Sequence, residues 1–145
     1  MRRLARTLMA GEQVAFMEKP DTKILLAYEA ILAAGGFVVL FLFLTMFSDL
    51  PINMKASMAV VFSLLSAGIL HFTIGNCTYV VTDQRLLIIN DLNSELKDSC
   101  ALEDITIIKR IGFANSLILE RNNGGPMRLV ALKNRNEAEQ AIVGS

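Results

Sequence analysis

Two long apolar stretches restrict what this chain can fold into. The first, ILLAYEAILAAGGFVVLFLFLTMF at residues 24–47, carries one charged residue, Glu29, and the second, ASMAVVFSLLSAGILHFTI at residues 56–74, carries His71 as its one ionisable residue. At about 1.5 Å rise per residue, a helix of either length can cross a hydrocarbon layer of roughly 30 Å. The residues between them, SDLPINMK, include Pro51 and suit a tight turn. The sequence therefore predicts a transmembrane helical hairpin with both chain ends on one side.

Basic residues are distributed unevenly around this hairpin. Five precede it, namely Arg2, Arg3, Arg6, Lys19 and Lys23, whereas the connecting loop carries only Lys55. The positive-inside rule therefore predicts that both termini are cytoplasmic. The three arginines alternate with Leu4 and Leu8 in a short basic amphipathic pattern, which makes Arg2, Arg3 and Arg6 candidate contacts with an anionic lipid surface. A solvated tail is the alternative interpretation.

Small residues recur at helical spacing in the second apolar stretch. Ala59, Ser63 and Ala67 are four residues apart, so they share one face on which two helix backbones can approach closely. Ala30 and Ala34 are the predicted partners on the first helix. Packing within the hairpin is one use for such a surface, and docking to helices of another protein is the other.

Glu29 and His71 are the ionisable residues inside the two stretches. Each lies near the predicted cytoplasmic end of its helix, so the two side chains are expected at similar depth. An ionisable group at that depth is costly unless it pairs or reaches the interface. We therefore expect a hydrogen bond between them with a structural role, because a proton relay needs a chain of such groups across the bilayer.

After Gly75 the apolar pattern changes from a helical period to alternation, with turn signals every few residues. This pattern predicts six short strands and a last helix over residues 135–143, and Val14–Phe16 offers a seventh strand before the hairpin. The Asn-Gly pair in NNGG is typical of a hairpin turn. The chain then divides into a tail at residues 1–23, the hairpin at residues 24–74 and a β-domain at residues 75–145.

The order of these segments resembles that of the bacterial pleckstrin-homology-like membrane proteins. The matching segments are GEQVAF, two apolar helices, YVVTDQRLLII, LEDI, NSLILE with NGG, and a short last helix. The most specific part is the motif formed by Tyr79, Thr82, Asp83 and Arg85. The resemblance implies an α+β membrane protein with an antiparallel β-barrel or sandwich and a C-terminal helix, on the cytoplasmic face of the bacterial inner membrane. It also implies self-association, and several members of the family are implicated in assembling or stabilising membrane complexes.

Several function classes lack the residues they need. The single histidine lies in the predicted hairpin, so the β-domain has no Ser, His and acid set, and NNGGP lacks the lysine of a phosphate-binding loop. Cys77 and Cys100 belong to no CxxC pair, which predicts small half-buried core residues in a reducing compartment and no metal or other cofactor. A formal net charge of +0 gives no long-range attraction to nucleic acid.

An apolar hairpin with small-residue faces, combined with the lack of a catalytic set, favours an interaction protein. We expect a non-enzymatic accessory, stabilising or assembly subunit of a larger inner-membrane complex of respiratory or photosynthetic type, in contact with membrane lipids and other integral subunits. The alternative is a homo-oligomeric module that binds lipid headgroups. From Gly75 onward, however, 8 basic residues face 9 acidic ones, whereas a headgroup pocket needs a concentrated basic cluster.

Overall fold

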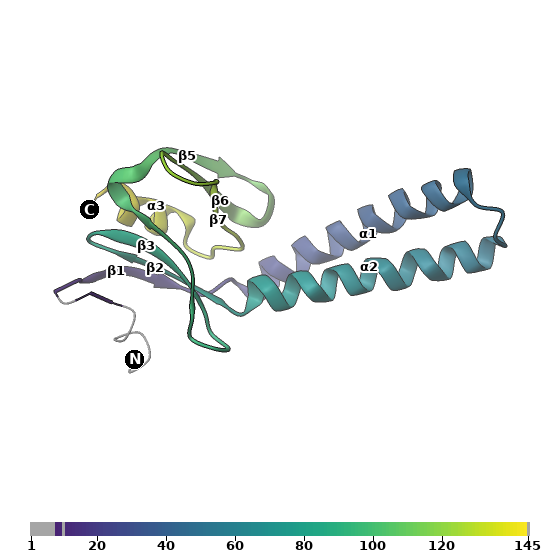
Figure 1. The fold of residues 1–145 in the computed structure, drawn as a ribbon, viewed down its shortest axis with the longest axis horizontal. Helices are drawn as coiled ribbons and strands as arrows, with labels where there is room; N and C mark the ends of the chain where they lie inside the picture. The colour runs from purple at the N-terminus through teal and green to yellow at the C-terminus, as the bar shows by residue number, and fades with distance from the viewer. Residues whose placement is uncertain (1–7, 10, 145) are drawn as a thin grey trace.

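The computed structural model describes residues 8, 9 and 11–144 of the chain, and its fold is α+β (Figure 1). The long elements of the hairpin are α1 (Thr22–Phe47) and α2 (Ile52–Gly75). The strands are β1 (Val14–Glu18), β2 (Cys77–Thr82), β3 (Arg85–Asn90), β4 (Leu96–Ala101), β5 (Ile105–Ile111), β6 (Ser116–Arg121) and β7 (Met127–Leu129). Two short 3₁₀ turns, η2 (Leu102–Asp104) and η3 (Phe113–Asn115), and the last helix, α3 (Arg135–Val143), complete the chain.

The two long helices form an antiparallel hairpin that projects from one end of the β-domain (Figure 1). Both are long and apolar enough to cross a membrane, with mean hydropathy of 2.5 for α1 and 1.9 for α2. Asp21 caps α1 by accepting hydrogen bonds from the backbone of Lys23 and Ile24. α2 begins at Ile52, earlier than expected, because Pro51 at its N-cap already has a φ compatible with helix entry. Lys55, predicted to lie in the loop, is therefore helical.

The strands form two separate antiparallel sheets. One has the order β1-β2-β3-β4 and the other the order β5-β6-β7. β1 precedes the hairpin and pairs with β2, which follows it, so the β-domain is built from both flanks of the hairpin. β4 and β5 are joined through η2 without pairing, and no barrel closes among the described strands. Of the two predicted forms, the closed barrel is therefore wrong.

The core of the β-domain lies between the two sheets. Its buried side chains come from β2 and β3 on one side and from β6 and β7 on the other, and include Tyr79, Val81, Leu86, Ile88, Leu117, Leu119, Met127 and Leu129. α3 packs against β1, β2 and β6 and contributes Ala138 and Ile142 to this core. The helix covers one side of the sheets.

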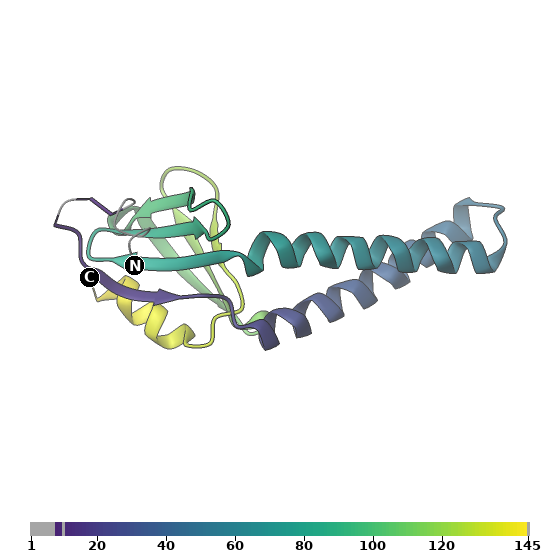
Figure 2. The ribbon, with the colours of Figure 1, turned by 90° about the horizontal axis from the view of Figure 1, so that it is seen from below.

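The direction of β2 fixes which end of the β-domain lies at the hairpin. β2 starts directly after α2 and runs away from it for six residues, about 20 Å, to Thr82 (Figure 2). The turn that joins β2 to β3 therefore lies at the far end of the domain. The next turn, between β3 and β4, returns to the hairpin, where the backbone N–H of Asp91 donates to the carbonyl of Asn76 at 2.7 Å.

Candidate functional site

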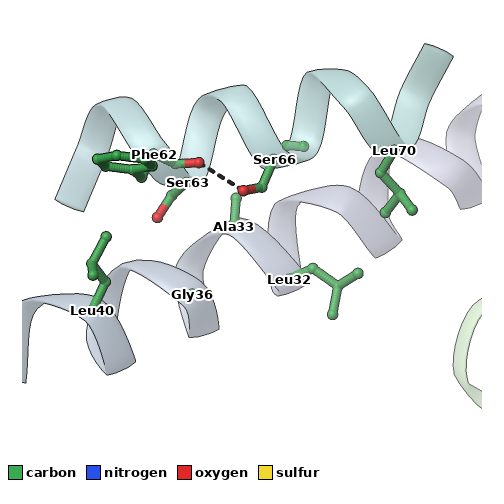
Figure 3. Close-up of a pocket in the computed structure, with 9 residues that line it drawn as sticks. Leu32, Ala33, Gly36, Leu40, Phe62, Ser63, Ser66 and Leu70 are labelled. Atoms are coloured by element: carbon green, nitrogen blue, oxygen red, sulfur yellow. Dashed lines mark hydrogen bonds between the residues drawn. The ribbon is translucent and has the colours of Figure 1, made fainter. Parts of the chain in front are cut away.

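A groove of about 300 Å³ lies between the two long helices (Figure 3). It is lined by Leu32, Ala33, Gly36 and Leu40 of α1 and by Phe62, Ser63, Ser66, Ala67 and Leu70 of α2. We call this surface the interhelical groove. Gly36 and Ser63 lie close to each other across the two helices, because a Cβ atom added at Gly36 would lie 3.8 Å from the hydroxyl oxygen of Ser63.

The hydroxyl of Ser63 is exceptional in this groove. The hydroxyls of Thr45, Ser57, Ser66 and Thr73 each donate to the carbonyl four residues earlier in their own helix. Ser63 makes no such bond: its side-chain oxygen is buried and has no hydrogen-bond partner among the described residues. An unsatisfied buried hydroxyl costs roughly 1–3 kcal/mol. The groove therefore contains one polar atom that is left without a partner.

The predicted small-residue face of α2 packs toward α1, but its partners are not those we expected. Ala59 and Ser63 are buried and Ala67 is half-buried. Ala30 and Ala34 are exposed, whereas Ala33 and Gly36 line the groove opposite Ser63. The prediction of Ala30 and Ala34 as partners is therefore wrong. Successive side chains are about 100° apart around a helix axis. A position misjudged by one residue therefore lies on a different face.

The expected contact between Glu29 and His71 is present. The Nδ1 atom of His71 lies 3.0 Å from Oε1 of Glu29, and the Glu29 side chain is 8% exposed while that of His71 is 47% exposed. Gly75 lies one turn beyond, where an added Cβ atom would meet Leu25 at 3.3 Å and the histidine ring at 3.7 Å. The pair joins the two helices near their β-domain end.

The Thr-Asp-x-Arg motif binds the segment that precedes β1. The Glu12 carboxylate accepts hydrogen bonds from Nε of Arg85 at 2.8 Å, Nη2 of Arg85 at 3.0 Å, the Thr82 hydroxyl at 2.7 Å and the backbone N–H of Met9 at 2.8 Å. Its side chain is fully buried, and the hydrogen bond with Arg85 lowers the pKa of Glu12 to about 2. We call Glu12, Thr82 and Arg85 the Glu12 clamp.

The remaining motif residue, Asp83, extends the same attachment. Its carboxylate accepts from the backbone N–H of Gln13 at 3.0 Å, and its own N–H donates to the Gln13 carbonyl at 3.0 Å. The role of Glu12 was missed in the sequence. A lone carboxylate in GEQVAF, opposite the arginine of a predicted turn, was the available signal. The clamp lies at the end of the domain remote from the helices, where it attaches the segment before β1 to the β2–β3 turn.

Tyr79 joins the two sheets. Its hydroxyl donates to the carbonyl of Val130 at 3.2 Å and accepts from the N–H of the same residue at 3.1 Å. Burial raises the pKa of Tyr79 to about 12. The phenol therefore stays protonated and satisfies both backbone groups of Val130, the residue just after β7.

Several cations of the β-domain are paired with carboxylates within the chain. Ion pairs join Arg85 to Glu12, Arg110 to Glu139, Arg121 to Asp98, Lys109 to Glu120 and Lys19 to Asp91. No three His, Cys, Asp or Glu side chains gather to hold a metal ion within the described part of the chain. Cys77 and Cys100 are buried free thiols, and burial raises the pKa of Cys100.

The predicted lipid contacts Arg2, Arg3 and Arg6 lie outside the described residues. Leu8, from the same amphipathic pattern, is described and packs against Val80, Leu87 and Ile89 on the outer face of the larger sheet. In the structure, Leu8 therefore contacts the β-domain.

Comparison of the chain with models of known protein families finds no match, and comparison with curated proteins finds none either.

Proposed function

We propose that this chain is a non-enzymatic, membrane-anchored interaction module, similar to the bacterial pleckstrin-homology-like membrane proteins. It serves as an accessory, stabilising or assembly subunit of a larger inner-membrane complex of respiratory or photosynthetic type. α1 and α2 cross the membrane, and the β-domain, a pleckstrin-like sandwich, lies on the cytoplasmic face. The five basic residues before the hairpin, against Lys55 at its tip, support this orientation.

The proposal rests on the interhelical groove. Its proposed occupant is a transmembrane helix of another integral protein. Ala33, Gly36 and Ala67 give the groove small side chains, so the backbone of another helix can approach it closely. Such a helix fits the shape of the groove. The Ser63 oxygen is buried within the hairpin itself and offers no contact to this occupant.

Headgroup recognition is less well supported. Three of the cations that an anionic headgroup could bind, Arg85, Arg110 and Arg121, are already paired with carboxylates, and Lys97 donates to the carbonyl of Thr73 at 3.0 Å. Binding a phosphate at any of the three arginines would have to break an existing ion pair.

Affinity purification in mild detergent, followed by mass spectrometry, tests the proposal through two matched pairs of variants. Gly36→Leu fills the groove, whereas Gly35→Leu makes the same change at the next position, which does not line it. Overpacking typically costs about 1–3 kcal/mol, so Gly36→Leu should lower recovery of an integral partner by roughly 5- to 150-fold and Gly35→Leu should not.

The second pair tests whether the serine hydroxyls matter apart from bulk. Ser63→Ala removes a buried oxygen that a partner cannot reach, so it should leave recovery of the partner unchanged. Ser66→Ala should also change it little, because that hydroxyl is already bonded to the Phe62 carbonyl. Purification of the chain alone, or with one lipid class and no protein, would contradict the proposal.

A further inference from the structure

Two turns of the β-domain lie beside the base of the hairpin, one at each helix. η3 (Phe113–Asn115) packs against α1, where the ring of Phe113 lies 5.0 Å from the ring of Tyr28. The β3–β4 turn (residues 91–95) lies at the end of α2, where Asp91 bonds to Asn76. We call these the flanking turns.

The depth of the flanking turns follows from the Glu29–His71 pair. The 18 residues from Ala30 to Phe47 carry no ionisable side chain and span about 27 Å, close to the thickness of a hydrocarbon core. The pair therefore marks the border of that core on the β-domain side. Tyr28 adjoins Glu29, so Phe113 lies at this border. Asn76 is five helical residues past His71, about 8 Å, which places the β3–β4 turn in the headgroup layer.

Each flanking turn exposes a large apolar side chain at this level. Phe113 is 44% exposed although it contacts Tyr28, and Leu92 is 55% exposed at the tip of its turn. Nothing lies within 4 Å of a Cβ atom added at Gly112, the residue before Phe113, so this position borders open space. Lys97 donates to the Thr73 carbonyl at the end of α2, which places a cation at the same height. Apolar tips with a neighbouring lysine at this depth suit the interface of a bilayer.

We propose that the flanking turns are a lipid-contact surface, in which Phe113 and Leu92 insert into the interfacial layer on either side of the hairpin. This inference rests on the proposed insertion of α1 and α2 in the membrane. The contacts hold the β-domain against the bilayer at two points beyond the helices, so that its orientation is fixed relative to the membrane. The surface requires bulk lipid, with no specific headgroup.

The chain contains no tryptophan, so one introduced tryptophan reports on its own surroundings. The full-length protein is placed in lipid nanodiscs with and without brominated acyl chains, which quench fluorescence by contact. Phe113→Trp and Leu92→Trp probe the flanking turns. Phe43→Trp, which lies within the apolar stretch of residues 30–47 in α1, is the reference for insertion, and Gln84→Trp, on the turn farthest from the hairpin, is the reference for exposure to water.

The expected result is strong quenching at Phe43→Trp, intermediate quenching at Phe113→Trp and Leu92→Trp, and none at Gln84→Trp. If Phe43→Trp is quenched while both flanking turns match Gln84→Trp, the lipid-contact surface is refuted and the membrane anchor stands. If Phe43→Trp is not quenched, the proposed membrane insertion fails and the lipid-contact surface fails with it.

Discussion

Replacing Glu12 with glutamine tests whether the Glu12 clamp holds β1 on the larger sheet. The substitution keeps the size of the side chain but removes the charge that Arg85 and Thr82 bind. In the folded protein the pKa of Glu12 falls from 4.5 to about 2, mainly through its hydrogen bond with Arg85, which corresponds to about 3 kcal/mol at neutral pH. Because the Arg85 side chain keeps 15% exposure and glutamine retains some hydrogen bonding, we expect a loss of about 2 to 3 kcal/mol.

Hydrogen exchange followed by mass spectrometry measures this loss locally. The amides of β1 that bond to β2 should exchange roughly 30- to 150-fold faster in Glu12→Gln, whereas amides of β6 and β7 should change little. Glu103→Gln, at an exposed carboxylate on η2, is the control for loss of one negative charge. Equal protection of β1 in wild type and Glu12→Gln would refute the clamp.

The same variant separates the pH dependence of the clamp from that of other carboxylates. A group whose folded pKa is lowered stabilises the protein fully above its unfolded pKa and loses this effect as pH falls through the folded value. The difference in protection between wild type and Glu12→Gln should therefore be full above about pH 4.5 and shrink toward about pH 2. A difference that stays constant across this interval would show that the Glu12 charge contributes nothing.

Further substitutions test the other connections in the β-domain. Tyr79→Phe leaves both backbone groups of Val130 without their partner, so the free energy of unfolding should fall by about 1–3 kcal/mol, measured by thermal unfolding in detergent with Tyr28→Phe as the control. Glu18 accepts hydrogen bonds from the backbone N–H groups of Lys133 and Asn134, just before α3; Glu18→Ala should cost about 1 kcal/mol, seen as faster exchange in α3 while the amides of β5 are unchanged. Unchanged melting in the first case, or unchanged α3 exchange in the second, would count against the assigned bonds.

Much of the secondary structure is visible in the sequence because the local signals agree with the fold. Six strands and the helix at residues 135–143 occur where alternation and turn residues predict them, and the suggested strand before the hairpin is β1. The start of β4 was missed because Leu96–Asp98 read as a polar connection. As an edge strand with a bulge opposite Ile88 and Ile89, β4 tolerates polar side chains that a central strand would not.

The contacts between elements were harder to predict, since they depend on geometry that no short segment contains. The phase of α1 decides whether Ala33 or Ala34 faces Ser63, and only the crossing of the two helices sets it. The separation into two sheets depends on η2, where the ladder from β4 does not continue into β5. Glu12 and Arg85 are 73 residues apart, so their ion pair follows from the pairing of β1 with β2 across the hairpin.

Site-specific photocross-linking in intact bacterial cells tests the central claim most directly. A photoreactive phenylalanine analogue is placed at Phe62, which lines the interhelical groove, or at Phe43, an equally exposed position on α1 outside it, at 54% and 55% exposure. The account predicts that the analogue at Phe62 cross-links to one integral membrane protein of defined mass, and that the analogue at Phe43 gives much less of this product. Cross-links to lipid alone at Phe62, or equal protein cross-linking at both positions, would contradict the assignment of the groove as the docking site.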